Sequence, residues 1–300
     1  MLIIKKIIAG FFLSILFLLI FVYLISAVKL FLDKQSSGER VFLGSLPGAV
    51  ENFEQSEKGE GVLPLEIGAQ AAISVKSDLR GTNTIIFQKN SDIKMPIASL
   101  TKLMTAVVVS NNYDLSQKIT VSAEADLQFP AKRDIKLGDA LPAGNLLEIM
   151  LIESSNRAAY ALAEAVGMEY FVELMNIEAK KIGMENTIFT DSTGLSSGNI
   201  STAKDLVNLA EYILKNYPRL AHISKTKYFY TPGFGSTINT NELLDEIPGI
   251  VFGKTGFTDE AKGCLLLVVI NQNDNNYFIN VVLGAEDRFD EMRKIVNLIL

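Results

Sequence analysis

The sequence is poor in the residues that form disulfides and metal sites. Its 300 residues include one cysteine, Cys264, and one histidine, His222. A single cysteine excludes an intramolecular disulfide, so the fold must depend on its hydrophobic core. A single histidine cannot form a histidine cluster, and no Cys/His/Asp/Glu spacing is typical of a zinc site. We therefore expect a protein without a metal or another cofactor.

Positive charge is also scarce. The 28 Lys and Arg residues are outnumbered by 34 Asp and Glu residues, which gives a net charge of −6 at pH 7. The longest basic runs are pairs, whereas surfaces that bind nucleic acid carry clustered Lys and Arg. The sequence therefore argues against a nucleic-acid partner.

Hydrophobic residues are abundant, at 48% of the chain, and a long uncharged stretch lies near the N-terminus. Residues 7–28 are mostly apolar and lie between Lys5-Lys6 and Lys29. A helix of this length would cross the ~30 Å hydrocarbon layer of a membrane. The apolar region of a cleavable signal peptide is shorter, about 7–15 residues. We predict a cytoplasmic N-terminus at 1–6 and an uncleaved transmembrane signal anchor at 7–28, with a cleaved signal peptide as the alternative.

The rest of the chain divides into a polar segment and one folded region. Residues 29–65 have no sustained hydrophobic period, which predicts a flexible stalk. Within residues 66–300, the pattern predicts helices between 99 and 217 and at 288–300. It also predicts strands at 69–77, 82–89, 250–257, 264–270 and 277–283. Strands at both ends with helices between them indicate an α+β domain with one antiparallel sheet.

Three short motifs carry reactive side chains, in the order S-x-x-K, S-x-N and K-T-G. Ser99-Leu-Thr-Lys102 places a hydroxyl and an amine on one face of a helix, where a neutral lysine could take the serine proton. The first two motifs are weak alone, since each occurs more than once in the chain. Context favours Ser99, at the start of a strongly apolar helix. It likewise favours Ser154 with Asn156, at a break between two apolar helices, and Lys254, near a strand end.

Together these motifs resemble the signature of the D-alanyl-D-alanine carboxypeptidases among the low-molecular-mass penicillin-binding proteins. The resemblance runs from about residue 68 to 300. The segments that carry it are PIASLTKLMTA (96–106), MLIESSN (150–156), GMENT (183–187), DSTGL (191–195) and GKTGFTDEA (253–261). It implies a penicillin-binding protein/β-lactamase-like transpeptidase fold, with a five-stranded antiparallel sheet, a helical subdomain and the active site between them.

The resemblance also implies a catalytic role for each motif residue. Ser99 would attack the carbonyl carbon between two D-alanines to form an acyl-enzyme, and Lys102 would take its proton. Ser154, linked to Lys254, would pass a proton to the leaving amine. Asn156 would hold the substrate amide.

Substrate-binding residues follow from the same resemblance. Thr255 would receive the terminal carboxylate of the substrate, together with Lys254 and Arg288. The backbone N–H group of Phe257, with that of the nucleophile, would form an oxyanion hole. Gly256, which has no side chain, would let the substrate approach the strand.

Two residues depart from the family pattern. Arg157 follows the S-x-N motif, so we expect a basic side chain beside the site, and Phe257 stands where His or Tyr is usual.

The implied function is a serine-type D-Ala-D-Ala carboxypeptidase that trims peptidoglycan pentapeptides and is acylated by β-lactam antibiotics. The N-terminal helix would hold it in the bacterial cell membrane, with the catalytic domain outside the cytoplasm.

Three alternatives remain open from the sequence. A D,D-endopeptidase or transpeptidase would differ only in the cleaved amide or the acceptor. A serine β-lactamase shares S-x-x-K and K-T-G, but its deacylating E-x-x-L-N pattern is absent between Asn156 and Lys254. A non-catalytic wall-binding module is the third, although it would not need all three motifs.

Overall fold

A computed structural model describes residues 65–129, 135–271 and 276–299. The predicted N-terminal segment 1–6, the predicted anchor 7–28 and all but the last residue of the predicted stalk lie outside these ranges. Within them, no helix is both long enough and apolar enough to cross a membrane.

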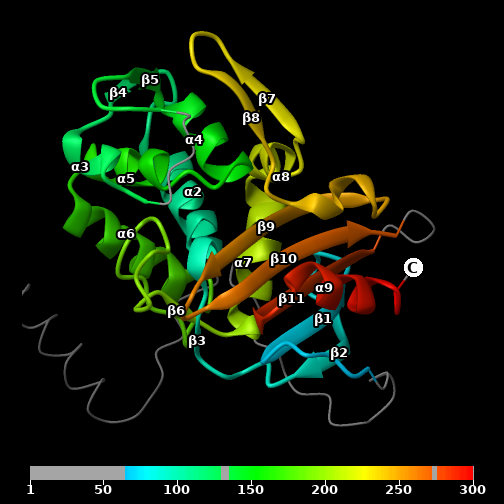
Figure 1. The fold of residues 1–300 in the computed structure, drawn as a ribbon. Helices are drawn as coiled ribbons and strands as arrows, with labels where there is room; N and C mark the ends of the chain where they lie inside the picture. The colour runs from blue at the N-terminus through cyan, green and yellow to red at the C-terminus, as the bar shows by residue number, and fades with distance from the viewer. Residues whose placement is uncertain (1–64, 130–134, 272–275, 300) are drawn as a thin grey trace, which may run out of the picture. The chain divides into compact units, whose positions relative to one another are not determined.

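The centre of the domain is a five-stranded antiparallel sheet built from both ends of the described chain (Figure 1). Its strands are β1 (Ala71–Ser77), β2 (Asn83–Lys89), β9 (Ile250–Thr258), β10 (Lys262–Ile270) and β11 (Tyr277–Ala285), in the order β2-β1-β11-β10-β9. Ala71 pairs with Leu283, which joins the N-terminal hairpin to the C-terminal strands. The predicted sheet is confirmed.

Both faces of the sheet are covered, which explains why β10 is an almost continuous apolar run. Successive side chains of a strand point to opposite faces. Leu265 and Leu267 pack in a cluster with Met292 of α9 (Arg288–Val296). Leu266 and Val268 belong to the larger core, on the side of the helical part. The sheet therefore lies between α9 and the helical part of the domain.

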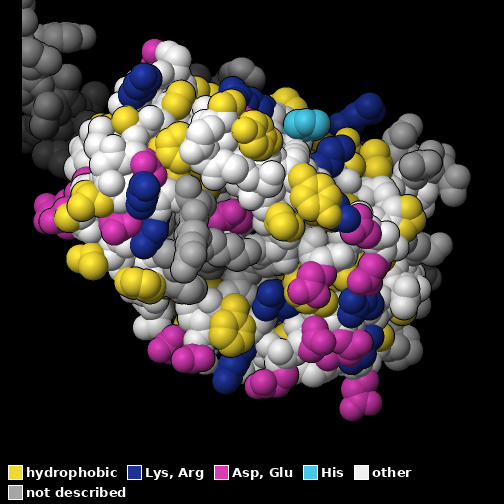
Figure 2. All heavy atoms as spheres, turned by 45° about the horizontal axis from the view of Figure 1, so that its top comes forward, with side chains coloured by type: hydrophobic (Ala, Val, Ile, Leu, Met, Phe, Trp, Pro, Cys, Tyr) yellow, Lys and Arg dark blue, Asp and Glu magenta, His cyan; other side chains and the backbone are white. Residues whose placement is uncertain are grey.

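The helical part surrounds α2, whose first nine residues are all buried. Its elements are η1 (Ala98–Leu100), α2 (Thr101–Asn112), α3 (Ala123–Asp126), α4 (Ala143–Ile152), α5 (Asn156–Glu164), α6 (Met168–Lys181), α7 (Ala203–Asn216) and α8 (Pro218–Ser224). The sequence predicted helix over most of this region. On the face in Figure 2, Lys and Arg side chains are interspersed with Asp and Glu and form no stripe.

Short elements that the sequence did not predict connect the helices. They are β3 (Met95–Pro96) paired with β6 (Ile200–Ser201), β4 (Lys118–Thr120) with β5 (Ala140–Pro142), β7 (Tyr228–Thr231) with β8 (Gly235–Ile238), and the 3₁₀ turn η2 (Glu242–Asp245). Strands of two to four residues are too short for their alternation to be recognised.

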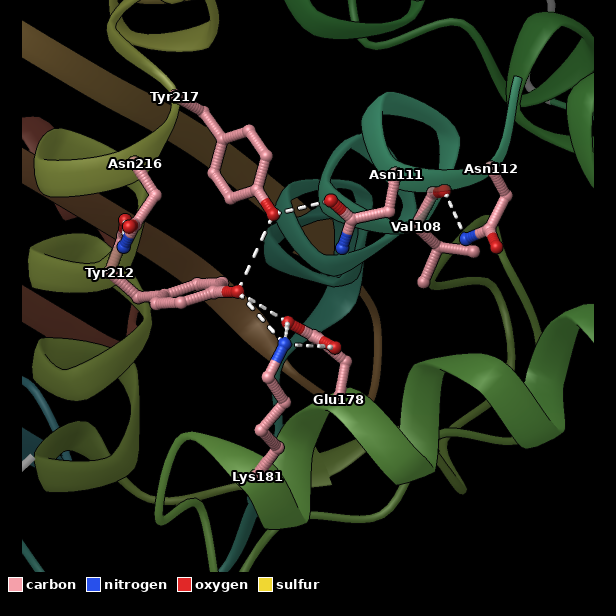
Figure 3. A network of polar contacts seen from close by, with 8 residues as sticks. All are labelled: Val108, Asn111, Asn112, Glu178, Lys181, Tyr212, Asn216 and Tyr217. Atoms are coloured by element: carbon pink, nitrogen blue, oxygen red, sulfur yellow. Dashed lines mark hydrogen bonds and ion pairs between the residues drawn. The ribbon is translucent and has the colours of Figure 1, made fainter. Parts of the chain in front are cut away.

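A polar network joins three helices of this part (Figure 3). The Tyr212 hydroxyl of α7 donates to Glu178 Oε1 of α6, and Lys181 donates to the same carboxylate at 3.0 Å. Tyr217, just after α7, donates to Asn111 Oδ1 of α2 at 2.6 Å. Burial raises the pKa of Tyr212, with the Glu178 hydrogen bond adding to the effect. The network fixes α2, α6 and α7 against one another.

Candidate active site

Ser99 lies in a tight turn that two glycines allow to pack closely. The preceding residue, Ala98, has φ of 48°, a left-handed conformation that is strained for a residue with a side chain. A Cβ on Gly194 would lie 2.1 Å from the Ala98 carbonyl oxygen, and one on Gly256 would lie 3.0 Å from the Ser99 nitrogen. The structure thus gives Gly256 a reason that the sequence did not: it leaves room for the serine turn.

Lys102 follows one turn later and is completely buried. Its Nζ lies 3.0 Å from Ser99 Oγ and 2.7 Å from Asn156 Oδ1, and it also donates to the Thr193 carbonyl. Burial lowers the pKa of Lys102 to about 7, although the charge of Asp191 opposes this shift. A substantial fraction of neutral amine is therefore present near neutral pH, within reach of the serine hydroxyl.

Asp191 shapes the loop that supplies the Thr193 carbonyl. Its Oδ1 accepts the backbone N–H groups of Thr193 and Gly194, each at 2.6 Å, and its Oδ2 accepts that of Ser196 at 2.7 Å. The loop thereby places Gly194 against the serine turn and Thr193 against the lysine. The segment 191–195 is one of those that carried the family resemblance, but no role was predicted for it.

A second serine–lysine pair faces the first. Ser154 lies at the predicted break between α4 and α5, with a left-handed φ of 65°. Its Oγ accepts a hydrogen bond from Lys254 Nζ at 2.7 Å, and Lys254 also donates to the Thr255 carbonyl at 2.8 Å. Lys254 is only 2% exposed. Ser155 caps α5 by accepting the N–H of Ala158 at 3.2 Å.

A pocket of about 240 Å³ connects these groups. Its lining includes most of the predicted site residues: Ser99, Ser154, Asn156, Thr255, Gly256, Phe257 and Arg288. The two lysines are buried behind it. Glu153 and Thr240 also line the pocket, and the sequence predicted neither. Thr240 contacts Thr255 through the two hydroxyl groups, and its N–H donates to Ile152 O at 3.1 Å.

Of the two arginines considered in the sequence, Arg288 lines the pocket and Arg157 does not. Arg288 lines the pocket, and its Nε is buried without a hydrogen-bond partner among the described residues. Burial lowers the pKa of Arg288. Arg157 follows Asn156 in the chain but is not among the residues that line the pocket. It donates to the carbonyls of Asp126 and Ile135, at 3.0 and 2.7 Å, and its Nη2 lies 3.2 Å from the Asp126 carboxylate.

The chemistry available is that of a serine nucleophile with a buried amine beside it. In the described part of the chain, no group of three or more His, Cys, Asp or Glu side chains could hold a metal ion. The pocket instead presents hydroxyl groups, an amide and a guanidinium around Ser99. Such a set suits acyl transfer from a substrate that carries a carboxylate.

Known proteins are similar to this chain in sequence and in fold. The family model described as D-alanyl-D-alanine carboxypeptidase, peptidase family S11, matches residues 56–287. A D-alanyl-D-alanine endopeptidase of Pseudomonas aeruginosa is 34% identical over 78% of each chain. The D-alanyl-D-alanine carboxypeptidase DacF of Bacillus subtilis is 32% identical over 72% of this chain and 57% of the relative.

Solved structures agree with this match. Penicillin-binding protein D2 of Listeria monocytogenes, in its cefotaxime-bound form, superposes with a TM-score of 0.71 at 29% identity. The superposition covers 79% of this chain and 98% of that protein. The fold implied by the motifs is therefore the fold observed.

Proposed function

The chain belongs to peptidase family S11, the D-alanyl-D-alanine carboxypeptidases, and is a serine-type DD-peptidase; we propose that it removes the terminal D-alanine from peptidoglycan stem peptides. The observation that carries this proposal is the buried Lys102 amine, 3.0 Å from the Ser99 hydroxyl. In this position, a neutral amine can act as the base for the serine.

In the proposed acylation, Ser99 Oγ attacks the carbonyl carbon of the penultimate D-alanine, and its proton passes to Lys102 Nζ. The backbone N–H groups of Ser99 and Phe257 stabilise the negative oxygen that develops. The C–N bond then breaks as the leaving amine takes a proton from Ser154 Oγ, which Lys254 holds at 2.7 Å. Ser154 Oγ regains a proton from the Lys102 ammonium, so the Lys102 amine is neutral again in the acyl-enzyme. Asn156 holds the substrate amide and also accepts a hydrogen bond from Lys102.

Deacylation completes the proposed cycle. Water attacks the ester carbonyl carbon on Ser99, and the neutral lysine amine takes the water proton. The ester C–O bond breaks, and the shortened peptide leaves as its carboxylate. Ser99 recovers a proton from Lys102. The side chains used in these steps line the pocket or, for the two lysines, lie within hydrogen-bond distance of a serine that does.

Arg288 and Thr255 are the proposed receptors for the terminal carboxylate. The buried Arg288 Nε has no hydrogen-bond partner in the described structure, and such a donor is costly unless a ligand supplies an acceptor. A carboxylate fits this requirement, because a guanidinium binds it with strong, charge-assisted hydrogen bonds. This supports a substrate with a free terminal carboxylate.

A D,D-endopeptidase is the second candidate, supported by the Pseudomonas aeruginosa relative and by an endopeptidase of Escherichia coli that is 36% identical. It would cleave the same kind of bond within a peptide cross-link. We expect release of D-alanine from an uncross-linked pentapeptide to be faster than cleavage of a cross-linked dimer. The reverse order would assign the protein to the endopeptidases.

The location of the enzyme is also a proposal. Its substrate lies outside the cytoplasm, and residues 7–28 have the length and composition of a transmembrane anchor. We place the domain on the outer side of the bacterial cell membrane. Protease accessibility of the domain in intact spheroplasts tests this placement, since a cytoplasmic domain would be protected.

Intact mass spectrometry with a penicillin tests the chemistry directly. We expect a stable adduct on Ser99 in the native protein and none in Ser99→Ala. An adduct that persists in the variant would contradict the assignment of the nucleophile. Loss of the drug without an adduct would indicate a β-lactamase. A folded protein with neither activity would indicate a wall-binding module.

A further inference from the structure

The β7–β8 hairpin exposes an aromatic face. Tyr228 pairs with Ile238, and Tyr230 pairs with Ser236, so these four side chains lie on one side of the hairpin. Tyr228, Tyr230 and Ile238 are 60%, 66% and 54% exposed. We call these four residues the hairpin face. Two such exposed tyrosines contribute nothing to the core and need another explanation.

The opposite side of the hairpin fixes it to the domain. Thr231 and Thr237 are buried, and Phe229 packs against the main core. The Asn239 side chain, just after β8, donates to the carbonyls of Ser224 and Thr226 at 2.8 and 2.9 Å. In Figure 1, the hairpin rises from the body of the domain near α4 and α8. The hairpin face is therefore held in place and is directed outward.

The hairpin leads directly into the active-site pocket. β8 ends at Ile238, and Thr240, two residues later, lines the pocket beside Thr255. The hairpin face is thus continuous with the site along the chain.

A lysine beside the hairpin face restrains one of its tyrosine rings. Residues 224–241 contain two lysines, Lys225 and Lys227, and no acidic residue, in a chain of net charge −6. Lys227 Nζ lies 5.1 Å from the centroid of the Tyr228 ring and forms an ion pair with Asp245. This contact restrains the ring before any ligand arrives, which reduces the entropy lost on binding.

We propose that the hairpin face binds the glycan strand that carries the stem peptide. This inference rests on the proposed function, since the glycan is attached to the proposed substrate. The flat faces of sugar rings carry C–H groups that pack against aromatic rings, and their hydroxyl groups pair with tyrosine and serine hydroxyls. Tyrosine offers a large, rigid contact surface of this mixed character.

Two other kinds of partner fit the face less well. A membrane-binding surface is dominated by Trp, Phe and Leu beside basic residues. Two lysines do lie near the hairpin face, but the face itself holds two tyrosines, a serine and an isoleucine and no Trp, Phe or Leu. A stable protein interface covers about 800 Å² on each partner. Four side chains of one short hairpin are too few for such an area.

The test compares two substrates with the full chain purified in detergent. One is a free pentapeptide, and the other is the same pentapeptide on uncross-linked glycan strands. For Tyr228→Ala/Tyr230→Ala, we expect KM for the glycan-linked substrate to rise about tenfold, the size expected when two ring contacts are lost. KM for the free peptide should not change. Tyr170→Ala removes a similarly exposed tyrosine, 54% exposed on α6, and should change neither value.

Several results would overturn the proposal. An equal rise in both KM values would show that the variant affects the pocket and not a glycan site. No rise in either KM value would show that the hairpin face does not bind the glycan. Binding of peptide-free glycan strands, measured by co-sedimentation, requires no catalysis. This binding assay therefore tests the hairpin face even if the protein releases no D-alanine. Failure to release D-alanine would refute only the proposed function.

A membrane partner gives a different pattern. Wild type and the double variant share the same N-terminal segment, so a difference in their binding to phosphatidylglycerol vesicles would come from the hairpin. Weaker vesicle binding by the double variant, with unchanged glycan binding, would assign the hairpin face to a membrane surface and overturn the inference.

Discussion

Two serine–lysine pairs meet in one pocket, but they are assembled differently. Ser99 and Lys102 are three residues apart and are brought together by one helical turn. Ser154 and Lys254 are 100 residues apart and meet only because β9 lies beside the break between α4 and α5. The first pair is therefore a product of local geometry. The second exists only when the sheet and the helical part are packed together.

The difference suggests a division of labour. In the proposed mechanism, the first pair supplies the nucleophile and its base, in a turn with strained backbone at Ala98. The second pair connects the two halves of the domain at the place where the leaving amine would be. Asn156 links them, because its Oδ1 accepts from Lys102 and it lies two residues from Ser154. Removing the first pair should abolish chemistry, whereas removing the second should slow it.

The largest expected effect separates the two lysines. Lys102→Ala should reduce the rate of acylation by a penicillin about 10³-fold or more, because the base for Ser99 is lost. Lys254→Ala should reduce it about 10²-fold, because a positioned electrostatic group is lost. Stopped-flow acylation with a fluorescent penicillin measures both rates.

The matched control for these variants is Lys204→Ala. Lys204 belongs to another S-x-x-K sequence and does not line the pocket. Its Nζ forms an ion pair with the Asp92 carboxylate at 3.4 Å. This variant should acylate at the wild-type rate. A Lys254 variant as inactive as the Lys102 variant would contradict the proposed division between the pairs.

The next effect is a pH dependence specific to the first pair. Because the pKa of Lys102 is lowered to about 7 by burial, the neutral amine is lost as the pH falls below that value. The acylation rate should then fall about tenfold per pH unit. The measurement is a pH–rate profile from pH 5 to 9 with a penicillin. A rate that stays constant down to pH 5 would show that Lys102 is not the base.

The stability of the fold should also depend on pH through the lowered pKa of Lys102. In the unfolded chain, the lysine pKa is near its ordinary value of 10.5, so between pH 7 and 10.5 the unfolded state binds more protons. The burial of Lys102 therefore destabilises the fold fully below pH 7 and progressively less above it. The gain in Tm of Lys102→Met over wild type should therefore be largest below pH 7 and should shrink as the pH rises. A difference that does not vary with pH would contradict the lowered pKa.

A smaller effect concerns the carboxylate rather than either lysine pair. Arg288→Gln should raise KM for the pentapeptide about tenfold or more, because a charged hydrogen bond is lost. Amidation of the terminal carboxylate should remove most of the difference between variant and wild type. Arg293→Gln is the control, since Arg293 lies on the same helix and binds Glu246 at the surface. An equal loss with the amidated peptide would exclude Arg288 as the receptor.

The sequence was sufficient for the parts of the fold and site that depend on long patterns. The strands of the main sheet were predicted because long apolar runs such as β10 are bounded by turns. The helix behind Ser99 and the break at Ser154 were predicted from the apolar segments around them. The order of the three motifs then grouped residues that the structure places around one pocket.

The remaining features depend on contacts between distant segments. The sequence could not show what Arg157 contacts, because its partners are carbonyl groups of Asp126 and Ile135, more than 20 residues away. The Thr193 carbonyl reaches Lys102 only because Asp191 folds its own loop. A backbone group carries no sequence signal of its own. Thr240 was missed because it belongs to no motif and contacts the site through a residue 15 positions away.

The smallest expected effect tests whether Thr240 belongs to the second pair's side of the pocket. Thr240→Val keeps the shape of the side chain and removes the hydroxyl that contacts Thr255, beside Lys254. We expect kcat/KM for the pentapeptide to fall about two- to tenfold, the cost of one hydrogen bond. Thr240→Ser should restore most of the activity.

A double-mutant cycle decides how Thr240 acts. If it positions Thr255, the losses in Thr240→Val and Thr255→Val should not add, because the first residue acts through the second. Additive losses would mean that Thr240 binds the substrate independently. Either way, penicillin acylation of Thr240→Val by Ser99 should stay within a fewfold of wild type, since the first pair is assembled within its own helical turn. A loss as large as that of Lys254→Ala would show that the two sides of the pocket are not separable.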